Sequence, residues 1–72
     1  PYKYLRIVIE DRPGQLSKII SDCSTINANI EDLSIEHSPG QFTGLITLAF
    51  LEEDSERVRT HLEGQGWSVH LA

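Results

Sequence analysis

One corner of the sequence constrains the fold more than any other stretch. Residues 4–9 are mostly apolar and rich in β-branched side chains, which predicts a strand, and apolar side chains then recur at helical spacing over residues 16–23. Residues 10–16, with the sequence EDRPGQL, must turn the chain from the strand into the helix. Pro13 suits the first helical position, where a missing N–H costs nothing, and Gly14 lets the backbone approach a neighbour closely. The sequence therefore predicts a strand, a tight corner and a helix.

The start of this predicted helix has the properties of an anion-binding site. The N–H groups of residues 14–16 have no acceptor within the helix, and the helix dipole places partial positive charge behind them. A carboxylate or a phosphate binds well in such a setting. The alternative is an ordinary turn between a strand and a helix, capped by Asp11. The corner alone does not separate the two interpretations.

The rest of the chain predicts three more strands and a second helix. Residues 38–41, Ser-Pro-Gly-Gln, predict a hairpin turn. We expect strands over about 3–10, 30–37, 42–51 and 67–71, and helices over about 14–25 and 52–63. The side chains expected to face the core are Leu16, Ile19, Ile20 and Cys23 on the first helix, Val58 and Leu62 on the second, and Trp67, Val69 and Leu71 on the last strand.

The order of these elements predicts an α+β fold, the ferredoxin-like βαββαβ sandwich. Each βαβ half needs a right-handed crossover, which places both helices on one face of a four-stranded antiparallel sheet, with the first and third strands central. The second strand carries carboxylates and suits an edge. Residues 1–72 form a single domain in this interpretation. Because the sequence starts at Pro1 and the last strand reaches the end, we expect a piece of a longer protein.

Composition narrows the classes of partner. The net charge of −5 argues against nucleic acid and against an anionic membrane surface, because both require a basic face. The sequence contains no apolar run long enough to span a membrane and no signal-peptide pattern, so we expect a cytoplasmic protein. The single cysteine, Cys23, lies on the apolar stripe of the first helix, which favours a buried and inert thiol.

The residues predict neither a metal site nor a catalytic site. His37, His61 and His70 lie on three different elements, and none has a second ligand at metal-binding spacing. No nucleophile and base can be paired. Asn29 stands at the start of the predicted edge strand, where its amide can both donate and accept. It either ends the helix or, if two copies join edge to edge, approaches the corner of the other copy.

These stretches resemble a known family. Residues 5–16, LRIVIEDRPGQL, together with Asn29-Ile30, resemble the signature of the ACT domain, the amino-acid-sensing module of many biosynthetic enzymes. Residues 29–40, 44–45 and 66–70 more narrowly resemble the C-terminal ACT domain of bacterial prephenate dehydrogenases, which use NAD in tyrosine biosynthesis. The resemblance covers almost the whole chain. It implies that two copies pair and bind an amino acid at their interface, and that NAD belongs to a catalytic domain outside these residues, with no cofactor in this one.

The resemblance also implies roles for individual residues. Asp11 would bind the ammonium group of the ligand, the amides of residues 14–16 its carboxylate, and Asn29 of the second copy its polar end. Serine-sensing relatives carry a histidine where this chain has Ile9, so an apolar or aromatic ligand is favoured, tyrosine first and phenylalanine second. The implied ligand-binding residues are Asp11, Arg12, Pro13, Gly14, Gln15, Leu16, Asn29 and Ile30.

Two other interpretations stay open. The chain could be a structural pairing domain without a ligand, or it could be an ACT domain of another enzyme of amino-acid metabolism. Nothing in the sequence separates a sensing domain from a pairing domain.

Overall fold

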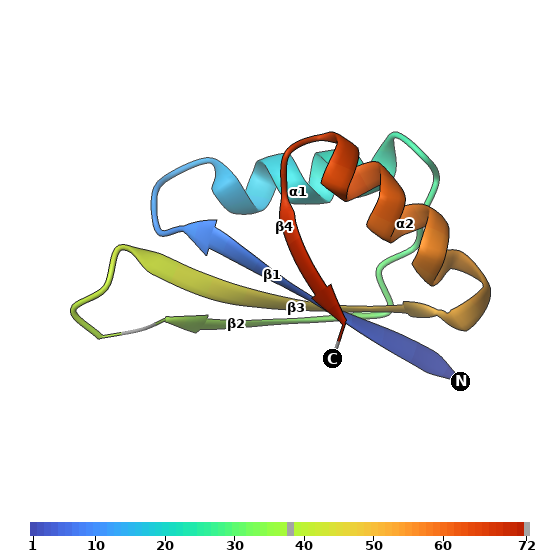
Figure 1. Ribbon diagram of the computed structural model, residues 1–72, viewed down its shortest axis with the longest axis horizontal. Helices are drawn as coiled ribbons and strands as arrows, with labels where there is room; N and C mark the ends of the chain where they lie inside the picture. The colour runs from blue at the N-terminus through green and yellow to red at the C-terminus, as the bar shows by residue number, and fades with distance from the viewer. Residues whose placement is uncertain (38, 72) are drawn as a thin grey trace.

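The computed structural model describes residues 1–37 and 39–71, which form one antiparallel sheet and two helices. The strand order in the sheet is β2-β3-β1-β4, and both helices lie on the same face of it (Figure 1). The predicted ferredoxin-like βαββαβ fold is therefore confirmed, with its first and third strands central and its second at an edge. The elements are β1 (Tyr2–Glu10), α1 (Gln15–Ser24), β2 (Asp32–His37), β3 (Thr43–Leu51), α2 (Glu52–Gly64) and β4 (Ser68–Leu71).

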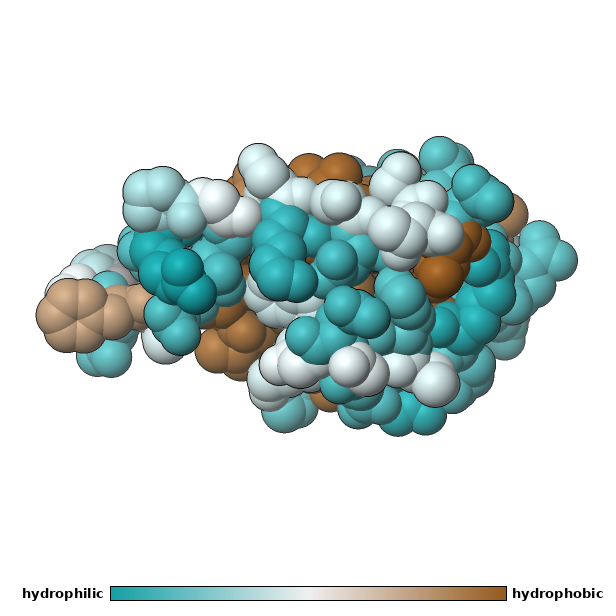
Figure 2. Space-filling model, turned by 90° about the horizontal axis from the view of Figure 1, so that it is seen from above, coloured by the Kyte–Doolittle hydropathy of each residue, from teal (hydrophilic) through white to brown (hydrophobic). Residues whose placement is uncertain are grey.

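The core lies between the sheet and the two helices. β1 alternates strictly, so that every second side chain from Leu5 to Ile9 faces the helices and the others face outward. α1 contributes residues three to four positions apart, because these share one face of a helix. The largest fully buried side chains are Phe50, Leu5, Ile7, Ile19, Ile46, Leu48, Leu62, Val58 and Cys23. Seen from the helix side, the surface is largely hydrophilic, with small apolar areas between the elements (Figure 2).

The helix after the corner begins later than predicted. α1 starts at Gln15, and Gly14 precedes it with a φ of 89°, in the left-handed region that favours glycine. Pro13 lies in the turn before Gly14, so its prediction as the first helical residue was wrong. The reason is that the left-handed Gly14 redirects the chain between the proline and the helix.

Two side chains predicted to face the core are exposed instead. Ile20 is 40% exposed and Leu71 is 63% exposed. Ile20 follows Ile19 on α1 by 100° of rotation, which turns it to the flank of the buried stripe. Leu71 is at the end of the edge strand β4, where it pairs with β1 on one side only. Phe42, predicted to start the third strand, lies before β3 and is 91% exposed.

The turns follow the residue types that occupy them. Asn27 has a φ of 54° in the turn after α1, as expected for an asparagine in the left-handed region. Gly40 has a φ of 72° between β2 and β3, in keeping with the predicted Pro-Gly turn, although Ser38 of that turn lies outside the described residues. Over the described ranges, neither helix is long and apolar enough to cross a membrane.

Candidate functional site

The corner between β1 and α1 is held by backbone hydrogen bonds. The N–H of Asp11 donates to the carbonyl of Phe42 at 2.7 Å, which ties the corner to the segment before β3. The N–H of Gln15 donates to the carbonyl of Arg12 at 3.4 Å, a long bond. The N–H groups of Gly14 and Leu16 have no acceptor within residues 1–37 and 39–71. Of the three amides predicted to bind a carboxylate, these two are therefore the freest to do so.

The side chain of Asp11 does not cap the helix. Its Oδ2 lies 3.5 Å from Nδ1 of His37, the last residue of β2. Both side chains are half or more exposed. The register explains this contact, because His37 and Ile9 both pair with Gly44 from opposite sides of β3. The corner thus lies beside one end of the edge strand.

Asn29 and Ile30 lie at the other end of the sheet. Nδ2 of Asn29 donates to Oε2 of Glu31 at 2.6 Å, and the N–H of Glu31 donates to the carbonyl of Ala49. Ala49 pairs with Tyr4, near the start of β1, whereas the corner follows the end of β1. Ile30 is partly buried and packs against the core. A single chain therefore does not bring Asn29 to Asp11.

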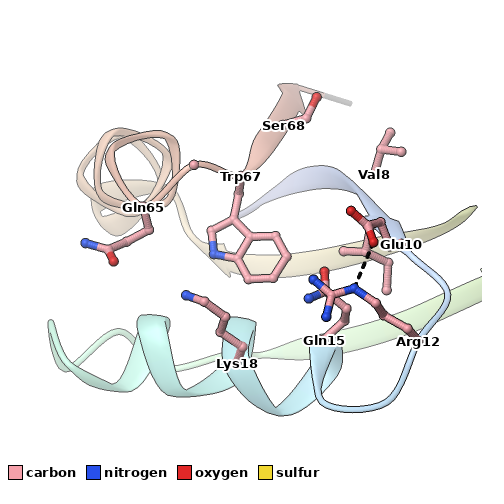
Figure 3. A pocket seen from close by; sticks show the side chains of 10 residues that line it. Val8, Glu10, Arg12, Gln15, Lys18, Gln65, Trp67 and Ser68 are labelled. Carbon is pink, nitrogen blue, oxygen red and sulfur yellow. Dashed lines mark hydrogen bonds and ion pairs between the residues drawn. The ribbon is translucent and has the colours of Figure 1, made fainter.

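A pocket of about 280 Å³ opens on the opposite side of the corner, toward β4. Of the predicted site residues, Arg12 and Gln15 line it. Lys18 and Trp67, which the sequence does not single out as site residues, also line it, from α1 and from the segment before β4 (Figure 3). Trp67 packs against the core as predicted, but it is only partly buried. Lys18 follows Gln15 by three positions on α1, a spacing that places both on one face and was the available signal.

Asp22 organises one wall of this pocket. Its Oδ2 accepts a hydrogen bond from Nε1 of Trp67 at 2.8 Å and another from Nζ of Lys18 at 3.1 Å. The ammonium of Lys18 also lies 5.4 Å from the centre of the Trp67 ring, within the range of a cation–π contact. The hydrogen bond from Trp67, helped by Lys18, lowers the pKa of Asp22. Asp22 is thus a carboxylate at neutral pH and holds both side chains.

Among residues 1–37 and 39–71, the structure shows neither a reactive thiol nor a cluster of metal ligands. Cys23 is buried as predicted, and burial raises the pKa of its thiol to about 11, so the thiol stays protonated at neutral pH. In the part of the chain that the structure describes, no three His, Cys, Asp or Glu side chains are grouped as metal ligands would be.

Comparison of the sequence with protein-family models and with curated proteins finds no significant match. Comparison with solved structures does find significant matches. The crystal structure of the ACT domain of prephenate dehydrogenase from Bacillus anthracis matches with a TM-score of 0.84 and 20% identity, over 93% of this chain and 99% of that one. A protein from Bacteroides thetaiotaomicron matches with a TM-score of 0.83 and 20% identity, over 97% of this chain and 46% of its own length. This chain therefore has the fold of the ACT domain of a prephenate dehydrogenase.

Proposed function

We propose that this chain is a regulatory domain that binds an α-amino acid between two copies of itself. The observation that carries the proposal is the contact between Asp11 and His37, which sets the anion-ready corner beside the end of the edge strand β2. The likeness to the ACT domain of a prephenate dehydrogenase supports the same assignment. In this proposal the domain serves a cytoplasmic, NAD-dependent enzyme of tyrosine biosynthesis and provides feedback control.

The edge strand offers a way to join two copies. β2 pairs with β3 on one side only, so its outer backbone groups are free to pair with another strand. A two-fold axis would pair β2 with β2 of a second copy in antiparallel fashion, and the start of one strand would then face the end of the other. Asn29 precedes β2 by three residues. In the pair, Asn29 of the second copy would therefore lie beyond His37, toward the corner.

Each polar group of an amino acid finds a partner in this arrangement. The amides of Gly14 and Leu16 suit the α-carboxylate, with the dipole of α1 behind them. Asp11 suits the α-ammonium, in exchange for its contact with His37. The amide of Asn29 from the second copy adds a hydrogen bond across the interface.

The side chain of the ligand would meet apolar groups. Leu16 is partly buried, and Ile30 of the second copy would approach from the other side. Ile9 is only 9% exposed, so it contributes less wall than the sequence suggested. Apolar walls give a small polar side chain nothing to bond, and they suit an aromatic ring. We therefore place tyrosine first and phenylalanine second.

A second candidate is a pairing domain without a ligand. It is favoured by one observation, namely that the carboxylate of Asp11 already contacts His37 within the same chain. In that case β2 would still pair with a second copy, and the corner would remain empty.

Calorimetry with tyrosine, phenylalanine, serine and glycine tests the proposal, at protein concentrations where sedimentation shows a dimer. We expect tyrosine or phenylalanine to bind, and Asp11→Ala to weaken binding about ten- to a hundredfold, because a charged hydrogen bond is worth roughly 1–3 kcal/mol. Glu53→Ala is the matched control, because it removes the same charge from an exposed position at the start of α2. Binding of serine or glycine alone would refute the aromatic pocket, and no binding of any amino acid would favour the pairing domain.

A further inference from the structure

The pocket on the β4 side of the corner lies across the corner from Asp11, and of the residues predicted for the amino-acid site it contains only Arg12 and Gln15. It lies between the corner, α1 and the segment that leads into β4, whereas Asp11 lies against the end of β2. Neither Asp11 nor Asn29 lines it. The pocket is also complete within one chain and needs no residue from a second copy.

The indole ring of Trp67 occupies the middle of the pocket, and polar side chains surround it (Figure 3). The ammonium of Lys18 lies at one side of the ring, and the guanidinium of Arg12 lies at another, next to Gln15. Val8 adds an apolar side chain at the rim. The pocket thus combines one aromatic surface with two cationic groups.

Both cationic groups keep hydrogen-bonding capacity for a ligand. Arg12 uses its Nε in a bond of 2.8 Å to Oε2 of Glu10, and its two terminal nitrogens donate to nothing else among the described residues. Lys18 uses one of its three protons in the bond to Asp22. A guanidinium with free terminal nitrogens and an ammonium with free protons both suit a carboxylate.

Hydrogen bonds within the chain hold one wall of the pocket in place. Asp22 holds both the Nε1 of Trp67 and the ammonium of Lys18, and the Asp22 side chain is only 14% exposed. The ring and the ammonium therefore keep a set distance from one another. A prearranged site loses less entropy when a ligand binds, which favours affinity.

Each cation of the pocket already pairs with one carboxylate. Arg12 pairs with Glu10 in the lining, and Lys18 pairs with Asp22 behind the wall. Both carboxylates are thus engaged, and no other carboxylate among the described residues lines the pocket for an ammonium group. The terminal nitrogens of Arg12 and the remaining protons of Lys18 are left as donors, so the pocket suits an anion better than an amino acid that needs both charges satisfied.

We propose that this pocket binds a small aromatic monocarboxylate. The carboxylate is held by Lys18 and Arg12, and the ring of the ligand packs against the face or edge of Trp67. A ring fits better than an inorganic anion, because the indole and Val8 leave apolar surface that only an apolar group would cover. No α-ammonium is required, which distinguishes this ligand class from the effector of the corner.

The protein offers a direct readout, because Trp67 is its only tryptophan. The probe is 3-phenylpropionate, titrated against the fluorescence of Trp67, and the matched neutral probe is 3-phenylpropionamide. We expect a saturable change in emission with the acid, and at least about tenfold weaker binding of the amide, the loss typical of a charge-assisted hydrogen bond. Equal binding of acid and amide, or no saturable change with the acid, would overturn the proposal.

Variants locate the binding and separate it from the proposed effector site. Lys18→Gln and Arg12→Gln should each weaken the binding of 3-phenylpropionate about three- to tenfold, since these groups are partly solvated. Lys3→Gln removes the same charge beside Glu52, away from the pocket, and should change affinity less than about twofold. Asp11→Ala should leave binding of the acid unchanged while it weakens any amino acid at the corner. Equal losses from Lys3→Gln and Lys18→Gln would refute a specific site, and circular dichroism checks that each variant is folded.

Discussion

Gly14→Ala should destabilise the domain through the backbone alone. Gly14 has a φ of 89°, and a Cβ built there would meet no atom within 4 Å. An alanine in the left-handed region costs about 1–2 kcal/mol, because its Cβ approaches the following carbonyl oxygen. Alanine also lowers the conformational entropy of the unfolded chain, which stabilises the folded state by about 0.4–1 kcal/mol. The net expectation is a free energy of unfolding lower by about 1 kcal/mol.

Gly64→Ala is the matched control. Gly64 is the last residue of α2, its φ lies outside the left-handed region, and a Cβ there also meets no atom within 4 Å. Both sites have room for a Cβ, but Gly14 precedes its helix in the left-handed region, whereas Gly64 lies inside α2. Alanine at Gly64 should therefore stabilise the domain by about 0.5–1 kcal/mol, through helix propensity and unfolded-state entropy.

Thermal unfolding followed by circular dichroism measures both variants, at one protein concentration because pairing raises Tm by mass action. In a domain of this size, 1 kcal/mol shifts Tm by about 4–8 °C. We expect Tm to fall for Gly14→Ala and to rise for Gly64→Ala. The Tm of Gly14→Asn should fall less than that of Gly14→Ala, because asparagine tolerates the left-handed region. Equal shifts for the two alanine variants would refute the left-handed turn before α1.

Three further predictions follow from the core and the pocket. The hydrogen bond from Trp67 is the main cause that lowers the pKa of Asp22 in the folded state, so Asp22 stabilises the fold above its unfolded pKa of about 4, and this stabilisation is lost as the pH falls through the folded pKa. In urea unfolding, the free energy of unfolding should therefore fall less between pH 7 and pH 3 for Asp22→Asn than for the wild type. Leu62→Ala should cost about 2–5 kcal/mol because Leu62 is fully buried, whereas Ile20→Ala, at a flank that is 40% exposed, should cost clearly less in the same urea titration. Cys23 should react with a thiol reagent near neutral pH only after denaturant unfolds the domain, because its thiol is buried with a pKa of about 11, and fast reaction of the native protein would contradict that burial.

The sequence predicts the elements and their order well, because hydrophobic periodicity reports directly on burial. The strand over residues 2–10 and the burial of Ile19 and Cys23 are both confirmed. Element bounds differ from the prediction by up to two residues. The prediction that Ile20 faces the core was wrong because it depends on tertiary packing. Only the packing of α1 decides that Ile19 is buried while Ile20 is exposed.

The candidate site was predictable only in part. The corner could be recognised from the local pattern of residues 10–16, but the left-handed turn at Gly14 moved the helix start past Pro13. The contact of Asp11 with His37 depends on the register of two strands on either side of β3. The pocket brings Lys18 together with Trp67 from distant parts of the chain, and no local pattern reports such a contact.

Mixed dimers give the most direct test of an amino-acid site between two copies. One chain carries Asp11→Ala and the other carries Asn29→Ala, with different affinity tags so that the mixed pair can be isolated. In the mixed pair, one of the two sites then joins an intact Asp11 to an intact Asn29, and the other site has lost both. Calorimetry with tyrosine should find half of the sites of the wild-type dimer at wild-type affinity, while each homodimer of a variant binds about ten- to a hundredfold more weakly. Two intact sites, or none, in the mixed pair would contradict a site that spans the interface.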